Sequence, residues 1–71
     1  MPTEINSRES DGITVELAMD FDNGEMFVNV FDVKNLEAFT IACDPSEAVE
    51  IYNHPFAYRD RAFVVTPMVA A

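Results

Sequence analysis

A chain of 71 residues is long enough for one small domain, and 49% hydrophobic residues, six phenylalanines among them, argue against disorder. Thirteen acidic residues against four basic ones give a formal net charge of -9, which argues against direct binding to nucleic acid or to an anionic membrane. The single cysteine, Cys43, has no partner for an internal disulfide, so we expect a reducing compartment, the cytoplasm.

The first eleven residues are polar and acidic, and they lack both a hydrophobic periodicity and the apolar stretch of a signal peptide. We expect residues 1–11 to form a flexible N-terminal leader. The rest of the chain, residues 12–71, is expected to fold as a single small α+β domain. No apolar run in it approaches the roughly 20 residues that a membrane-spanning helix needs.

A β-hairpin is the clearest structural signal. Residues 13–22 alternate strictly between apolar and polar side chains, which is typical of a half-buried strand. The dipeptide Asn23-Gly24 follows and favours a type I′ turn, because both of its residues accept a positive φ. The return strand, residues 26–33, is rich in valine and phenylalanine. With a two-residue turn, Leu17 lies opposite Val30 on an apolar core face.

The opposite face of this hairpin carries acidic side chains together with Phe27 and Phe31. A glycine bulge would shift the register by one residue and move both phenylalanines into the core. We favour the unshifted register. It leaves a second face that is either covered by another element or is itself an acidic, aromatic binding surface.

The second half of the chain predicts one more strand and a helix. Residues 36–42 form a shorter strand in which Phe39 and Ile41 share a face. Asp44 fits the N-cap of a helix, Pro45 its first position and Glu47 a capping box. The residues at helical spacing, which are expected to pack on the sheet, are Ala48, Ile51, Tyr52 and Pro55 or Phe56.

Pro55 disfavours a helical conformation at His54, so the helix should end or kink there. Residues 56–61 fit a second short helical turn, and residues 62–66 fit an edge strand because they are β-branched and aromatic. The predicted fold is α+β: a small antiparallel sheet of three strands, or four with residues 62–66, and one helix packed on one face.

Candidate catalytic and metal-binding groups are sparse. Cys43 and His54 are the only residues of their kinds, and a continuous helix between them would hold them about 15 Å apart, too far for a catalytic dyad. One cysteine and one histidine are too few for a zinc site. The acidic residues before Gly24 do not have the spacing of a calcium-binding EF-hand loop. We therefore expect no enzymatic activity, no metal and no cofactor.

The distribution of charge points to a protein partner. Between Glu9 and Val33 the chain carries seven carboxylates and no lysine or arginine. Carboxylates clustered on rigid strands can satisfy the lysines and arginines of another protein as phosphates do. The predicted partner-binding residues are Glu16, Asp20, Asp22, Glu25 and Asp32, with Phe27 and Phe31 as apolar anchors and Tyr58, Arg59 and Arg61 as a second, aromatic and basic group.

In its size, acidity and lack of catalytic groups, the whole chain resembles small phage-encoded inhibitors of host defence, such as anti-CRISPR and anti-restriction proteins. The resemblance implies an inhibitor that mimics nucleic acid and covers a basic surface of a nucleic-acid-binding protein. The resemblance rests on composition and includes no motif, so it assigns no functional role to any individual residue. The alternative is a small structural or accessory subunit, a homodimer or part of a larger assembly, whose charge serves solubility.

Overall fold

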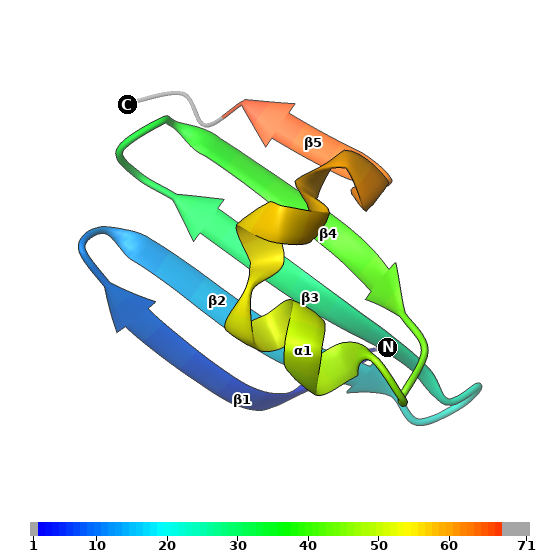
Figure 1. Ribbon diagram of the computed structural model, residues 1–71. Helices are drawn as coiled ribbons and strands as arrows, with labels where there is room; N and C mark the ends of the chain where they lie inside the picture. The colour runs from blue at the N-terminus through cyan, green and yellow to red at the C-terminus, as the bar shows by residue number, and fades with distance from the viewer. Residues whose placement is uncertain (1, 68–71) are drawn as a thin grey trace.

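The computed structural model describes residues 2–67. Its main element is a five-stranded antiparallel sheet in which the strands lie in the order of the sequence (Figure 1). The strands are β1 (Pro2–Ser10), β2 (Ile13–Asp20), β3 (Glu25–Asp32), β4 (Glu37–Cys43) and β5 (Val64–Pro67). A short α-helix, α1 (Ala48–Asn53), and a 3-10 helix, η1 (Pro55–Arg61), connect β4 to β5.

The predicted α+β fold with three or four strands is wrong, because the chain forms mainly a five-stranded antiparallel sheet and is a small β-rich fold. Residues 2–10, predicted as a flexible leader, are strand β1 and pair with β2. The dipeptide Asp11-Gly12 joins these strands with φ angles of 54° and 79°, as a type I′ turn requires. All nine residues of β1 are exposed. Because neither side of this strand is buried, its sequence lacks the alternation of apolar and polar residues that predicts a half-buried strand.

The β2–β3 hairpin has the predicted faces but not the predicted turn. Its loop spans four residues, 21–24, and Gly24 has a φ of 77°. Leu17 therefore lies opposite Val28 instead of Val30. This difference is a shift of two residues, which keeps the side chains of β2 and β3 on their predicted sides of the sheet. Phe21, predicted to end the strand on the core face, lies in the loop and is 68% exposed. The one-residue shift that would have buried Phe31 in the core does not occur.

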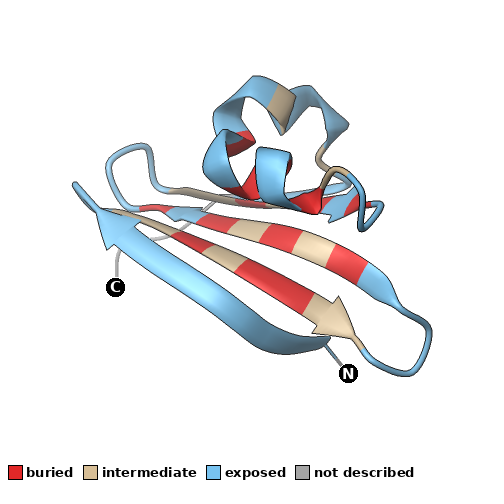
Figure 2. Cartoon of the chain, turned by 60° about the horizontal axis from the view of Figure 1, so that its bottom comes forward, coloured by how far each residue is buried: buried red, intermediate tan, exposed pale blue. Residues whose placement is uncertain are grey.

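The helical segment lies over one face of the sheet, and the hydrophobic core fills the space between them (Figure 2). The predicted packing positions are confirmed, since Ala48, Ile51, Tyr52 and Pro55 are all buried. Phe56, the alternative to Pro55, remains 45% exposed. The core face of the sheet supplies mainly valine, leucine and isoleucine side chains, together with Phe39.

The predicted helix start is wrong by three residues, because α1 begins at Ala48 after a turn at residues 45–47. Glu47 occupies the N-cap position in place of Asp44. One half of the predicted capping box is nevertheless present, since the Asp44 backbone N–H donates to Glu47 Oε2 over 3.1 Å.

The other elements predicted in this half of the chain are present, with bounds that differ by one or two residues. The helix ends at Asn53, before His54, and η1 is the second helical turn. The edge strand expected at residues 62–66 is β5, which pairs with β4.

Candidate functional site

No element within residues 2–67 covers the face of the sheet opposite α1 and η1 (Figure 2). We call this surface the open face. Because side chains alternate along each strand, the pairing of the strands determines which residues lie on it. They are Pro2, Glu4, Ser7 and Glu9 of β1, Thr14, Glu16, Ala18 and Asp20 of β2, Glu25, Phe27, Asn29 and Phe31 of β3, Ala38, Thr40 and Ala42 of β4, and Val64 and Thr66 of β5.

A hydrogen-bonded polar row crosses the middle of the open face. The Thr40 hydroxyl donates to Asn29 Oδ1 over 2.8 Å, and Asn29 Nδ2 donates to Glu16 Oε1 over 3.4 Å. The three residues are directly opposite one another on β2, β3 and β4. These contacts restrain the Glu16 carboxylate before any partner binds, which lowers the entropy cost of using it in an interface.

Three phenylalanines gather beside this row. Phe27 and Phe31 lie on either side of Asn29 along β3, and the ring centroid of Phe27 is 6.2 Å from that of Phe63. Phe31 is 38% exposed and Phe63 is 61% exposed. Phe63 was not predicted as a site residue, because it precedes β5 and belongs to no periodic pattern. The β3–β5 side of the open face is therefore aromatic and partly apolar.

The β1–β2 side of the open face is acidic. Glu16 and Asp20 were predicted here, and β1 adds Glu4 and Glu9 to them. The Thr14 hydroxyl donates to Glu9 Oε2 over 3.2 Å. Glu4 and Glu9 were missed for the same reason as β1 itself, because their segment was predicted to be a leader.

The predicted acidic contacts near the β2–β3 loop also have local structural roles. Asp20 Oδ1 accepts the backbone N–H of Asp22 over 2.9 Å, and the Asp20 carbonyl accepts the N–H of Gly24 over 2.7 Å. Glu25 pairs with Asp20 across the hairpin, at the end of the open face. These carboxylates therefore lie together at the loop end of the acidic side.

Asp32 does not belong to the open face, and its prediction as a partner-binding residue is wrong. Its side chain lies on the covered side and is only 1% exposed. It accepts hydrogen bonds from the side-chain amide of Asn35 over 2.7 Å and from its backbone N–H over 3.1 Å. The hydrogen bonds from Asn35 hold the pKa of Asp32 below its ordinary value. The carboxylate thus orders the β3–β4 loop.

The predicted aromatic and basic group lies on η1, across the sheet from the open face. Arg59 Nε donates to Glu37 Oε1 over 2.9 Å, and Arg61 binds Glu47 through two hydrogen bonds of 2.8 and 3.1 Å. The hydrogen bonds from Arg61, together with that from the Asp44 backbone N–H, lower the pKa of Glu47 to about 2. The Arg61 guanidinium also lies 5.8 Å from the ring centroid of Tyr58. Both arginines therefore neutralise local carboxylates, and the group does not join the predicted acidic residues on one surface.

The candidate nucleophile and base are separated. Cys43 ends β4 and is buried, and this burial raises the pKa of its thiol. His54 follows α1, at the other end of that helix. Within residues 2–67, no group of three or more histidine, cysteine, aspartate or glutamate side chains could hold a metal ion. In the same part of the chain, no helix has the length and apolarity needed to cross a membrane.

Comparisons of the chain with protein-family models, with curated proteins and with solved structures gave no match. The surfaces and charges described above are therefore the basis for a functional proposal.

Proposed function

We propose that the open face binds a basic surface of a partner protein, and that the chain acts as a non-enzymatic inhibitor that mimics nucleic acid. One observation carries the proposal. A whole face of the five-stranded sheet is left uncovered by residues 2–67 (Figure 2). The strand pairing places carboxylates on it beside exposed phenylalanines. Exposed aromatic side chains grouped with charged residues are typical of protein interfaces.

The chemistry of the open face suits arginine and lysine side chains. An arginine can donate two parallel hydrogen bonds to a carboxylate such as Glu16. Its guanidinium can also lie over an aromatic ring such as that of Phe31. Neighbouring strands are about 4.8 Å apart, so their carboxylates form a closely spaced array on a rigid support. A nucleic-acid backbone presents its phosphates to a binding groove in a similar way.

A homodimer or accessory subunit is the second candidate function, and the edge strand β5 favours it. Val64 and Val65 of this strand are 44% and 49% exposed. An exposed, apolar edge strand can pair with the same strand of a second copy. In this case the acidic open face serves solubility. Either function would act in the cytoplasm, where a lone thiol stays reduced.

Charge reversal on each side of the sheet tests the proposal. The double variant Glu16→Lys/Glu25→Lys changes the open face. The matched control Asp44→Lys/Asp60→Lys changes the net charge equally at exposed positions flanking and within the α1–η1 segment. Each tagged protein captures partners from a bacterial lysate at about 0.1 M salt and is then washed at about 0.5 M, where the Debye length is roughly 4 Å.

We expect the wild type and the control to retain a nucleic-acid-binding protein at low salt and to lose it in the wash. Excess duplex DNA should release the same partner, and the open-face variant should not capture it. A partner that survives the wash, or that the open-face variant still binds, would contradict mimicry. Salt-resistant self-association that is lost in Val65→Asp would instead support the dimer.

A further inference from the structure

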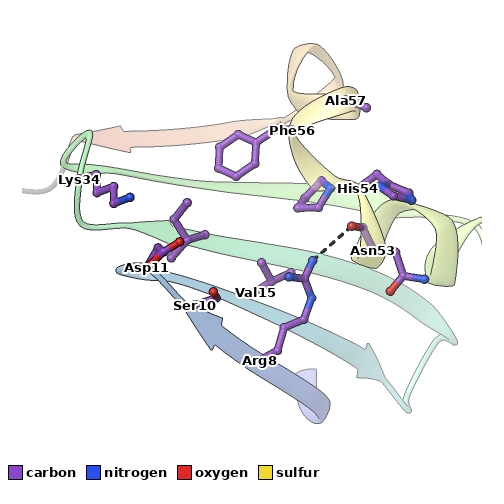
Figure 3. Close-up of a pocket in the computed structure, with 11 residues that line it drawn as sticks. Arg8, Ser10, Asp11, Val15, Lys34, Asn53, His54, Phe56 and Ala57 are labelled. Atoms are coloured by element: carbon purple, nitrogen blue, oxygen red, sulfur yellow. Dashed lines mark hydrogen bonds between the residues drawn. The ribbon is translucent and has the colours of Figure 1, made fainter.

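A hollow of about 490 Å³ lies on the covered side of the sheet, across from the open face (Figure 3). Residues of β1, β2 and the β1–β2 and β3–β4 turns form one part of its wall, and the segment from Asn53 to Ala57 forms the other. Its volume falls within the range of about 300–1,000 Å³ that is typical of small-molecule sites. We call it the basic hollow, because Arg8 and Lys34 line it.

Positive charge collects around this hollow in an otherwise acidic protein. The chain has four basic residues, and two of them, Arg59 and Arg61, form ion pairs beneath η1. The other two, Arg8 and Lys34, line the hollow together with the only histidine, His54. Within residues 2–67, neither Arg8 nor Lys34 has a carboxylate within ion-pair distance, although the charge of Lys34 attracts the Asp32 carboxylate and helps to lower its pKa.

The Arg8 guanidinium is held in place by the helical segment. Its Nη2 atom donates to the carbonyl oxygens of Tyr52 over 2.8 Å and Asn53 over 3.3 Å. The guanidinium also lies 5.3 Å from the ring centroid of Tyr52. Both hydrogen bonds come from one nitrogen, so in the described chain the donors on Nε and Nη1 remain for an anion. A fixed donor loses little entropy when it binds a ligand.

Apolar side chains line the space between the two basic residues. Figure 3 shows Lys34 toward one end of the hollow and Arg8 toward the other, with Phe56 and Val15 between them. Phe56 packs edge-on against the core at Phe39, with 5.6 Å between ring centroids, yet it remains 45% exposed. An aromatic surface of this kind can stack on a flat apolar group.

We propose that the basic hollow binds a small organic anion, a carboxylate or phosphate monoester that carries a flat apolar group. Arg8 binds the anionic group, Phe56 and Val15 contact the apolar part, and Lys34, toward the other end of the hollow, attracts the anion at longer range. Asp11 also lines the hollow and opposes an anion, so its removal should act in the opposite direction from the removal of Lys34. This site is independent of the protein interface proposed for the open face.

The probes are phenylacetate and phenyl phosphate, with phenylacetamide as an uncharged analogue of phenylacetate. Each is titrated into the full chain, and binding is followed by backbone amide NMR. We expect both anions to shift the amides of the basic hollow and to bind about fivefold or more tightly than phenylacetamide, the factor that corresponds to one modest charge interaction. Equal affinity for the uncharged analogue, or shifts confined to other surfaces, would overturn the proposal.

Two variants at the hollow should change the affinity for phenylacetate in opposite directions. Lys34→Gln should weaken it by about two- to fivefold, and Asp11→Asn should strengthen it by a similar factor. Asparagine tolerates the positive φ at this turn position, so the hairpin is preserved. The controls Arg61→Gln and Glu25→Gln make the same changes in net charge outside the hollow and should leave the affinity unchanged.

Arg8→Gln is not the decisive variant, because Arg8 also holds α1 against β1. If the two controls change the affinity as much as the two hollow variants, the effect comes from the overall charge of the protein and the site is refuted. The site is refuted as well if Lys34→Gln and Asp11→Asn both bind phenylacetate like the wild type.

Discussion

Replacing a phenylalanine with alanine on each face of the sheet tests whether the open face lies outside the hydrophobic core. Phe39 lies on the covered face and is 1% exposed, whereas Phe31 lies on the open face and is 38% exposed. A Phe→Ala change deletes the same atoms at both positions. The difference between the two losses in the free energy of unfolding therefore reports the difference in burial.

The expected losses differ by a factor of two or more. Phe→Ala at a fully buried core position costs about 3–5 kcal/mol, because a cavity remains. Full burial of a phenylalanine is worth about 1.5–3 kcal/mol, and Phe31 is about 60% buried, so Phe31→Ala should cost about 1–2 kcal/mol. The total stability of a domain of this length is about 4–10 kcal/mol. Phe39→Ala should thus leave a marginal fold, while Phe31→Ala stays folded.

Urea unfolding followed by far-UV circular dichroism provides the measurement. With a slope of about 1 kcal/mol per molar urea, Phe31→Ala should lower the midpoint by about 1–2 M without changing the slope. Equal losses for the two variants would place Phe31 in a core. That result would mean that the β2–β3 register is shifted by one residue, and it would remove the surface on which the proposed interface depends.

Two further predictions concern an ion pair and a turn. Hydrogen bonds from Arg61, the larger cause, and from the Asp44 backbone N–H lower the pKa of Glu47 from an ordinary value of 4.5 to about 2. These contacts therefore stabilise the fold fully above about pH 4.5 and are lost as the pH falls toward about 2. Glu47→Gln should therefore flatten the decline in melting temperature over this range, and an unchanged decline would contradict the ion pair. At Gly24, φ is 77° and an added Cβ would have no neighbour within 4 Å, so Gly24→Ala should cost about 1–2 kcal/mol from the backbone alone. Gly24→Asn should cost less in urea unfolding, and equal stability of wild type and alanine variant would refute the role of the left-handed conformation.

Hydropathy alternation could predict β2 because one of its faces packs against the core. It could not predict β1, whose side chains are all exposed. This edge strand is held by backbone pairing with β2 and by the contact of Arg8 with α1, and neither leaves a hydropathy pattern. Asp11-Gly12 was the available signal, because it forms a two-residue turn of the kind that was expected at Asn23-Gly24, which instead belongs to a four-residue loop.

The length of the β2–β3 loop depends on side-chain contacts, which the preference of Asn-Gly for a two-residue turn does not take into account. Asp20 bonds the backbone inside this loop, and Asp32 does the same in the β3–β4 loop, which also has four residues. The last residue of each loop has a positive φ, and in the second loop that residue is Leu36, with φ 51°. Since Leu36 is neither glycine nor asparagine, its sequence position gave no indication of the turn.

The placement of Phe27 and Phe31 on the face opposite the core was predicted despite the wrong turn, because a shift of two residues leaves the faces unchanged. The same alternation places Asp32 on the side of Val28 and Val30, the covered side. Its charge suggested a partner contact, but its position at the end of β3 lets Asn35 satisfy it locally. For this residue the strand pattern was a better guide than the charge.

The arrangement of charge allows an experiment that separates a functional role from a contribution to solubility. Two of the four basic residues neutralise carboxylates beneath η1, and the other two line the basic hollow on the same side of the sheet. The strands of the open face carry acidic side chains and no basic ones that point outward among residues 2–67. If the charge served only solubility, its position would not matter, and Glu16→Lys/Glu25→Lys would behave like Asp44→Lys/Asp60→Lys in every assay. A loss of partner binding in the first variant alone, at equal solubility, would therefore assign the function to the open face.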